Sequence, residues 1–181
     1  KTLTDDSARE IAEEMKIRQT NEVFLLFALG SQFDHLIKLT LDRLGVFCLV
    51  SDPASVKVED VKRVNPKGII LSGGPVSVYE EAPPFDGRIF DLGIPVLGIC
   101  LGFQLWAQHI GAKVSRGEKR EFGTHLFSRA DNQSSLFADC ADGMPVLESH
   151  GDIIESHDKI TILGRTENAP GAAGNNQHLW G

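Results

Sequence analysis

The sequence predicts an α/β fold in which an open, mainly parallel, twisted sheet is covered by helices on both faces and extended by extra antiparallel strands. Before Lys113, continuous apolar runs of strand length alternate with amphipathic stretches of helical length, which is the pattern of a buried parallel sheet. After Lys113 the helical pattern stops and short β-like stretches follow one another. We therefore expect the later strands to extend or flank the parallel core.

The first expected element is a helix within residues 1–22. Asp5-Asp6-Ser7 followed by Glu10 is the pattern of a capped helix start. An apolar stripe on this helix is formed by Ile11, Ala12, Met15 and Ile17. We expect this N-terminal extension to pack on the flank of the domain that follows, residues 23–181, rather than to be dedicated to a partner.

Local patterns place the remaining elements in order. The four apolar runs expected to form parallel strands are residues 23–29, 46–50, 68–71 and 95–99. The helices between and after them are expected at residues 33–44, 56–64, 86–92 and 101–110. Gly45 and Gly111 stand where two of these helices should end. One side of the first of these helices is formed by Phe33, Leu36, Ile37, Leu41 and Leu44. The later strands are expected around residues 124–128, 145–148, 160–163 and 178–180.

Composition excludes several classes of function. The 181 residues, 41% of them hydrophobic, suffice for one domain with a sizeable core. A net charge of -7 argues against nucleic acid or an anionic membrane as a partner. No segment has the apolar length of a membrane span, and we expect no leader segment before the fold. The three cysteines do not form a disulfide or zinc pattern, so we expect a cytoplasmic protein without a metal site.

A single thiol stands at the break between a predicted strand and a predicted helix. Cys100 is the centre of Gly98-Ile99-Cys100-Leu101-Gly102. A strand followed by Gly-x-Cys-x-Gly forces a tight turn that presents the central side chain at the start of the helix. Unpaired N–H groups and the helix dipole at that position favour the thiolate, the reactive form of cysteine. We therefore expect Cys100 to be an activated nucleophile rather than a buried structural cysteine.

Four sequence blocks together indicate a family. They are Gly30-Ser31-Gln32, Leu71-Ser72-Gly73-Gly74-Pro75 continuing into Ser77-Val78-Tyr79, the turn around Cys100, and Ser149-His150-Gly151-Asp152. On these blocks the chain from about Phe24 to Gly181 resembles the class I glutamine amidotransferases, and among them the branch found in GMP synthetase. Relatives that serve anthranilate, carbamoyl phosphate or CTP synthesis share the turn but differ in the glycine loop and the His block.

This resemblance implies a flavodoxin-like core and a defined activity. The side-chain amide of L-glutamine would be hydrolysed to glutamate and ammonia through a thioester on Cys100. The ammonia would pass to an ATP-pyrophosphatase (synthetase) unit, fused or separate, that converts XMP to GMP. No cofactor is expected in this chain itself, because ATP and magnesium would bind only to the synthetase unit.

Amide hydrolysis also needs hydrogen-bond donors for the tetrahedral oxyanion. The N–H of Leu101, directly after the nucleophile, is one natural donor, and a glycine loop at a neighbouring strand end should supply another. The resemblance identifies the second donor as Gly74, with Gly73 beside it as a substrate contact. A plain tight turn is the alternative for this loop.

Further substrate contacts are expected on the helix after Cys100 and on a later segment. Gln104 lies one helical turn beyond the thiol, and by resemblance its amide contacts glutamine. The segment containing His150, Gly151 and Asp152 follows a predicted strand, and its backbone groups could hold the amino-acid end of the substrate. A surface turn is the alternative for this segment.

The catalytic base is where the sequence departs from the family pattern. In the family a strand like His178-Leu179-Trp180-Gly181 continues into the catalytic His and, two residues later, the Glu that orients it, whereas this sequence stops at Gly181. By resemblance His150 is not the base. Surface positions are expected for the histidines at 35, 109, 125 and 157. We therefore expect the domain to be cut short and the sequence to be an incomplete view of a longer chain.

Two other functions stay open at this point. One is a catalytically incomplete paralogue that binds a synthetase partner or glutamine and regulates it. The other is a cysteine hydrolase that acts on a different γ-glutamyl compound and needs no synthetase. A second departure, Ala28-Leu29 in place of the family's usual acidic and aromatic residues before Gly30, weakens any transfer of detail to that first loop.

Overall fold

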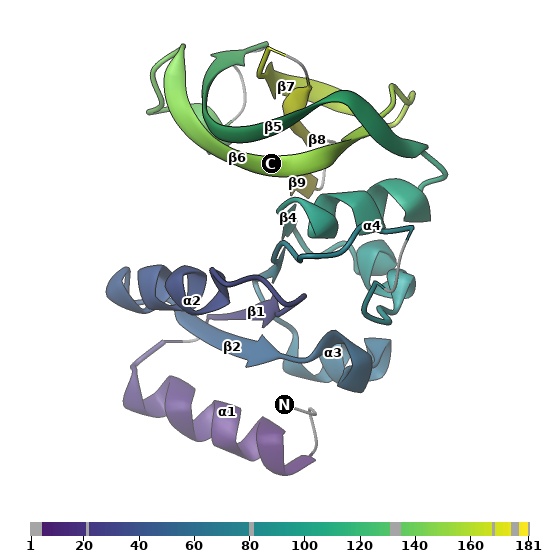
Figure 1. Cartoon of the computed structure of the whole chain (residues 1–181). Coiled ribbons are helices and arrows are strands. Elements are labelled where there is room, and N and C mark those ends of the chain that lie inside the picture. Colours follow the sequence, from purple (N-terminus) through teal and green to yellow (C-terminus); the bar gives the residue numbers. More distant parts are fainter. Residues whose placement is uncertain are drawn as a thin grey trace.

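The computed structural model describes residues 5–20, 22–79, 82–130, 135–167, 169–174 and 178–180. Within these ranges the strands form one 9-stranded sheet in the order β2-β1-β3-β4-β9-β8-β7-β5-β6. Figure 1 shows its parallel part flanked by helices and its antiparallel part, β5 to β8, at the opposite end of the molecule from α1. The predicted combination of a parallel core with added antiparallel strands is confirmed.

The parallel part of the sheet consists of five short strands. They are β1 (Val23–Phe27), β2 (Phe47–Ser51), β3 (Gly68–Leu71), β4 (Val96–Gly98) and β9 (His178–Trp180). Each pairs in parallel with its neighbour, from β2 through β1, β3 and β4 to β9. Leu25, Leu26 and Phe27 of the interior strand β1 have no exposed surface, because both faces of a parallel sheet are covered.

Helices and 3-10 turns cover the two faces of this parallel sheet. They are α2 (Asp34–Arg43), α3 (Val58–Val64), α4 (Leu101–His109) and η2 (Gly87–Leu92). Two further 3-10 turns are η1 (Pro53–Ser55), which follows β2, and η3 (Ser135–Phe137), which packs in the antiparallel part. On one face, Leu25 and Phe27 pack in a core shared with α3, η2 and α4. On the other face, Leu26 packs against Ile37 and Leu41 of α2. The segment predicted as a helix at residues 86–92 forms the 3-10 turn η2 instead.

The apolar side of α2 is narrower than the sequence predicts. No residue of this helix is fully buried, and Phe33, Leu36 and Leu44 are exposed by 45%, 44% and 72%. Only Ile37 and Leu41 pack against the small core on this face. Of the five apolar residues expected on one side of this helix, three are thus largely exposed, because the core that receives the helix is only a few side chains wide.

The antiparallel part is longer than its sequence pattern indicates. Its strands are β5 (Val114–Arg129), β6 (Met144–Ile154), β7 (Thr161–Arg165) and β8 (Pro170–Gly174). β5 and β6 form a long ribbon, interrupted by an irregularity between Arg116 and Glu121. The predicted strands at 124–128 and 145–148 are only parts of β5 and β6, and β8 was not predicted. Polar residues early in β5 and the small residues of β8 hide the period-2 pattern of a strand.

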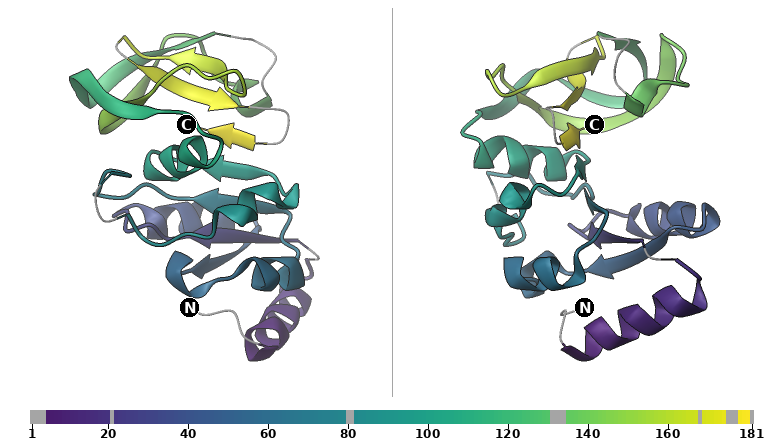
Figure 2. Two further views of the ribbon diagram at one scale, coloured as in Figure 1. Left: turned by 90° about the vertical axis from the view of Figure 1, so that its right-hand side faces the viewer. Right: turned by 180° about the vertical axis from the view of Figure 1, so that it is seen from behind.

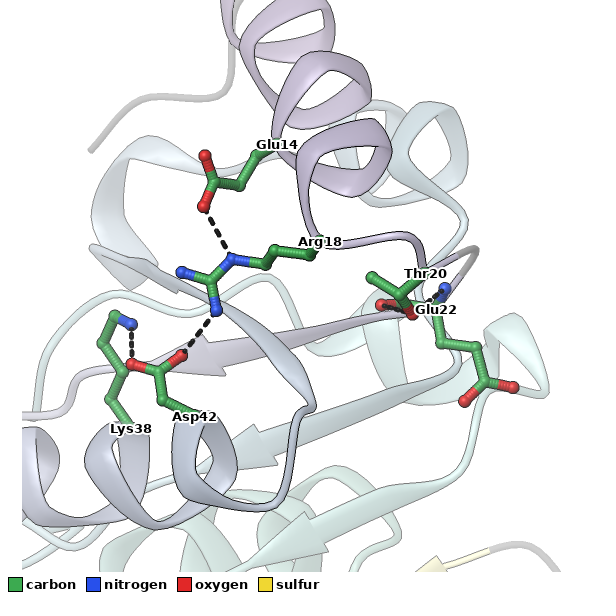
Figure 3. Close-up of polar contacts among 6 residues, drawn as sticks. All are labelled: Glu14, Arg18, Thr20, Glu22, Lys38 and Asp42. Atoms are coloured by element: carbon green, nitrogen blue, oxygen red, sulfur yellow. Dashed lines mark hydrogen bonds and ion pairs between the residues drawn. The ribbon is translucent and has the colours of Figure 1, made fainter.

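Helix α1 (Asp5–Ile17) packs on the flank of the parallel sheet, as expected. Ile11 is buried in the main core, and Met15 packs beside it. Arg18, just after the helix, lies 5.2 Å from the centre of the Phe47 ring. Figure 3 shows Arg18 between Glu14, at 2.6 Å, and Asp42, at 3.3 Å. Two further views show α1 at the edge of the molecule, away from the antiparallel strands (Figure 2). None of the helices in the described residues is long and apolar enough to cross a membrane.

Candidate active site

The turn around Cys100 has the strained geometry that a nucleophile elbow requires. β4 ends at Gly98 and α4 begins at Leu101, so only two residues connect strand and helix. Cys100 itself has φ 50° and ψ -108°, a left-handed conformation that side chains other than glycine adopt rarely and at a cost. The thiol therefore lies at the carboxyl end of a central parallel strand, where open α/β sheets usually bind their ligands.

The second glycine of the elbow is needed for close packing of helix against strand. A Cβ atom added at Gly102 would lie 2.6 Å from the Cβ of Leu71 and 2.7 Å from the carbonyl oxygen of Leu71. Since that oxygen belongs to the end of β3, a larger residue would push α4 away from the sheet. The sequence pattern around Cys100 thus has a direct structural cause.

Two backbone N–H groups converge on the Cys100 thiol. Hydrogen bonding from the backbone of Leu101 and of Gly74 lowers the pKa of this thiol. Gly73 lies at the same place, since a Cβ added there would be 3.5 Å from the Cβ of Cys100. The structure therefore brings together the predicted nucleophile, both predicted oxyanion donors and the adjacent glycine, from the end of β3 and the start of α4.

The thiol is nevertheless not activated by these donors alone. Burial raises the pKa of Cys100 above its usual value, and this effect exceeds that of the Leu101 N–H. The carboxylates of Glu148 and Asp152 raise the same pKa further. The backbone groups at the helix start thus act in the expected direction, but the pKa of the thiol stays raised because desolvation and the two negative charges have the larger combined effect.

The glycine loop is held in place by the chain on either side of it. Ser72 is fully buried, and its Oγ accepts a hydrogen bond of 2.9 Å from the N–H of Leu29. Gly30, with φ 96°, lies close enough to Pro75 that an added Cβ would be 3.4 Å from the Pro75 Cδ. The first sequence block therefore supports the loop.

Gly74 must be glycine because protein atoms surround it. An added Cβ would lie 2.6 Å from the Leu101 Cδ2 and 2.8 Å from the carbonyl oxygen of Leu29. Any side chain at this position would displace backbone of the loop before Gly30 or the start of α4. The loop is thus a tight turn in its own right, and its N–H also points at the thiol.

Gln104 is buried and has an unused acceptor. Its backbone N–H donates to the carbonyl oxygen of Cys100 at 3.1 Å, which places it one turn into α4. The residue is only 6% exposed, and its Oε1 has no hydrogen-bond partner among the described residues. A buried amide oxygen without a partner is costly, so a ligand that donates to it would be favoured.

The block from Ser149 to Asp152 lies inside β6, not in a turn after a strand. Side chains alternate along β6, so Ser149 is exposed while His150 faces inward. His150 Nε2 is 3.2 Å from a carboxylate oxygen of Glu148 and 3.4 Å from one of Glu121. The hydrogen bond with Glu148 is the main reason that the pKa of His150 is raised. The His150 Nε2 atom therefore contacts two carboxylate groups, those of Glu148 and Glu121.

Glu121 is the residue of this region that the sequence did not reveal. Its side chain has no exposed surface, and its Oε2 accepts a 2.7 Å hydrogen bond from the Thr166 hydroxyl. His125 Nδ1 lies 3.7 Å from the other oxygen, so the expectation that His125 is a surface residue is wrong. The available signal was the alternation of Glu121 with His125 and Phe127 on one face of β5, which becomes visible only once the strand is known. No group of His, Cys, Asp and Glu within the described ranges is arranged as a metal site.

Comparison with known proteins places this site in a family. Residues 25–179 match the family model described as glutamine amidotransferase class-I. The chain is 36% identical over 169 residues to the GMP synthase [glutamine-hydrolyzing] of Bacillus mycoides, covering 91% of this chain and 33% of that protein. It is 43% identical over 159 residues to the protein of the same name from Phaeosphaeria nodorum, covering 84% of this chain and 29% of that protein. The chain thus spans about a third of the length of these curated relatives.

Solved structures agree on the fold. A protein of Thermoplasma acidophilum described as a GMP synthase subunit superimposes with a TM-score of 0.78 at 23% identity, covering 88% of this chain and 81% of that one. A glutamine amidotransferase of Thermotoga maritima gives a TM-score of 0.69 at 21% identity, covering 88% of this chain and 74% of that one. With the family match over most of its length and relatives of this similarity, the chain belongs to the class I glutamine amidotransferases.

Proposed function

We propose that this chain is the glutaminase unit of a GMP synthase and that Cys100 is its nucleophile. The Cys100 sulfur attacks the side-chain carbonyl carbon of glutamine, and the resulting oxyanion is bound by the N–H groups of Leu101 and Gly74. Collapse of this intermediate breaks the C–N bond, releases ammonia and leaves a glutamyl thioester, which water hydrolyses to glutamate and free thiol. The convergence of both N–H groups on a strained Cys100 is the observation that carries the proposal.

The substrate would be held between the glycine loop, α4 and β6. The unpaired Gln104 Oε1 can accept a hydrogen bond from glutamine, and Gly73 leaves space beside the thiol. β6 lies at the edge of the described sheet, so outward backbone groups near Gly151 are available for the amino-acid end of the substrate. We assign the backbone of the segment from His150 to Asp152 to this role.

Thiol activation needs a proton acceptor that the described residues do not place at Cys100. His150 contacts Glu121 and Glu148, and the charged groups that raise the pKa of the thiol are acidic. β9 pairs in parallel with β4, and Trp180 is opposite Gly98, so chain continuing from β9 would emerge beside the elbow. We propose that a His-x-Glu segment at this position supplies the base, as the resemblance implies, and that its imidazolium would lower the pKa of Cys100.

The ammonia would be used by an ATP-pyrophosphatase unit that converts XMP to GMP. The curated relatives named GMP synthase are about three times as long as the matched region, which supports a synthetase unit as the partner. ATP and magnesium would bind to that unit and not to this one.

The proposal is tested by replacing and by labelling the thiol. In the complete protein, Cys100→Ala should abolish glutamine-dependent amination and leave amination from ammonium salts, because the thiol serves only amide cleavage. An electrophilic glutamine analogue should label Cys100 and spare Cys140 and Cys48, the last of which is buried with its pKa raised to about 11. Glutamine binding without ammonia release would instead support the regulatory paralogue. Ammonia release that is greater from another γ-glutamyl compound, and independent of the synthetase, would support the alternative hydrolase.

A further inference from the structure

The loop that contains Gly74 continues into a segment that is attached to the antiparallel ribbon. Ser77 Oγ donates a 2.6 Å hydrogen bond to Asp152 Oδ2 of β6. The same Oγ accepts from the N–H of Tyr79 at 3.4 Å. The Tyr79 hydroxyl in turn donates to the carbonyl oxygen of Val114 at the start of β5. Two side chains of the loop thus reach the ribbon formed by β5 and β6.

These two attachments lie close together on the same ladder. Val114 is paired with Ile154, and Asp152 is paired with Arg116. The ladder is regular over this short stretch, before the irregularity that follows Arg116. The ribbon therefore offers a fixed platform at the point where the loop touches it.

The other end of the loop is fixed to the parallel sheet. Buried Ser72 accepts from the N–H of Leu29, and its own N–H donates to the carbonyl oxygen of Phe27 at 3.1 Å. Between Ser72 and Ser77 there are only four residues, and two of them are glycines with little intrinsic preference for one conformation. The direction of the Gly74 N–H consequently depends on both ends being held.

Asp152 is near enough to the reaction centre for this attachment to matter there. Its carboxylate is one of two that raise the pKa of the Cys100 thiol, while its Oδ2 is already engaged by Ser77. A hydrogen bond to a carboxylate that is partly shielded from water is among the stronger and more directional ones. The Asp152 carboxylate is thus well placed to connect β6 to the loop through Ser77.

We propose that Ser77 and Asp152 form a clasp that fixes the Gly74 N–H over Cys100, and that the Asp152 side chain is a positioning residue acting through Ser77. This inference rests on the proposed glutaminase function for its reaction. It assigns the Asp152 carboxylate to the loop, and leaves substrate contact on this segment to the backbone. It also explains why a serine follows the glycine loop at a position that touches no predicted substrate group.

The clasp predicts a specific pattern of kinetic losses. Ser77→Ala and Asp152→Ala should each lower kcat for glutamine hydrolysis roughly tenfold to a hundredfold with little change in KM, because misplacement of a donor by about 1 Å costs rates of this order. The double variant should be no slower than the slower single variant, since both changes break one interaction. Asp152→Asn should retain most of the activity, because its amide oxygen still accepts from Ser77. Exposed controls on the same half of the molecule are Ser128→Ala and Asp158→Asn.

Other outcomes would overturn the clasp. A raised KM in Asp152→Ala, with Ser77→Ala unaffected, would mean that the carboxylate binds substrate. Additive losses in the double variant would mean that the two side chains act separately, and wild-type kinetics in all variants would mean that the attachment has no function. Urea unfolding of each variant shows whether a loss of activity comes from loss of the fold.

A second measurement separates this inference from the proposed function. Alkylation of Cys100 by chloroacetamide, followed at the high-pH plateau where the thiol is fully ionised, needs neither glutamine nor a base. The clasp predicts faster alkylation in Ser77→Ala, in Asp152→Ala and equally in the double variant, because the loop over the thiol loosens. If wild-type protein does not hydrolyse glutamine, the proposed function fails while this comparison still decides the clasp. Equal alkylation rates in all four proteins would overturn it.

Discussion

The parallel and antiparallel halves of the molecule contribute to the site in different ways. The parallel half supplies Cys100 and two backbone N–H groups, held by close packing at Gly74 and Gly102. The antiparallel half supplies side chains with charge, among them Glu148 and Asp152 near the thiol. The comparison teaches that backbone geometry builds the turn of the proposed nucleophile and its proposed donors, whereas the ribbon of β5 and β6 supplies carboxylates that raise the pKa of the thiol.

The largest expected loss of stability comes from a substitution in the antiparallel half, at the buried Glu121. Glu121→Ala would leave His150 and Thr166 facing a cavity without their buried carboxylate. We expect the free energy of unfolding to fall by about 3–5 kcal/mol, the usual cost of removing one partner of a buried ion pair. Urea unfolding measures this change. Glu155→Ala, which removes an exposed partner of Lys113, is the matched control and should change stability far less. An equal effect of both variants would mean that Glu121 is not an anchor of the ribbon.

In the parallel half, the substitution expected to be most disruptive is Gly102→Ala, in the turn around Cys100. Gly102→Ala places a Cβ against the Leu71 carbonyl, so we expect a loss of about 1–3 kcal/mol in stability from overpacking. We also expect glutamine hydrolysis to fall further than this destabilisation explains, because α4 and the Leu101 N–H must shift. Gln108→Ala on the exposed side of α4 is the control. Normal activity in Gly102→Ala would show that the elbow tolerates displacement of its helix.

A residue of the antiparallel half, Glu148, influences the pKa of Cys100 in the parallel half. Glu148→Gln should lower the pKa of Cys100, because burial remains but one of the two raising carboxylates is neutralised. Alkylation of Cys100 near neutral pH should therefore become faster, and mass spectrometry can follow it. No change in the rate would mean that the antiparallel half does not set the charge at the thiol.

Glu148→Gln should also shift the pKa of His150 in a predictable direction. The pKa of His150 is raised above its usual value, chiefly by the hydrogen bond to Glu148. The stability that this contact contributes is therefore fully present below the unfolded-state pKa, about 6.5, and is lost as the pH rises through the higher folded-state value. In an NMR titration, Glu148→Gln should lower the pKa of His150, and the pH dependence of unfolding should weaken. An unchanged titration would assign the shift to another neighbour.

Far from the site, the polar contacts of α1 should matter least. Arg18→Ala removes the partly exposed ion pairs with Glu14 and Asp42 and the contact of the guanidinium with the ring of buried Phe47. We expect a loss of about 0.2–1 kcal/mol, because exposed ion pairs contribute little, and no change in glutamine hydrolysis. Ile11→Ala, which empties part of the main core, should cost more. The reverse order would mean that the flank of the sheet is held by charge rather than by packing.

The difference between the halves also explains what the sequence could predict. Continuous apolar runs such as Val23–Phe27, and the glycines around Cys100, follow from local sterics and burial, so the parallel core and the elbow were predictable. Glu121 was not, because a buried carboxylate is stabilised by partners from β6 and from the turn after β7 that no local pattern reveals. The block at 149–152 was expected to follow a strand, with a surface turn as the alternative, but pairing with β5 keeps it extended within β6. The raised pKa of Cys100 depends on burial and on β6, which only the fold brings together.

Detection of the covalent intermediate would test the central claim most directly. The complete protein is mixed with glutamine, quenched in acid during turnover and analysed by peptide mass spectrometry. The proposed mechanism predicts a glutamyl group on the peptide that contains Cys100, absent from those containing Cys48 and Cys140, and absent altogether in Cys100→Ala, which should release no ammonia from glutamine. Undiminished ammonia release by Cys100→Ala, or a glutamyl group on another residue, would contradict the assignment of Cys100 as the nucleophile.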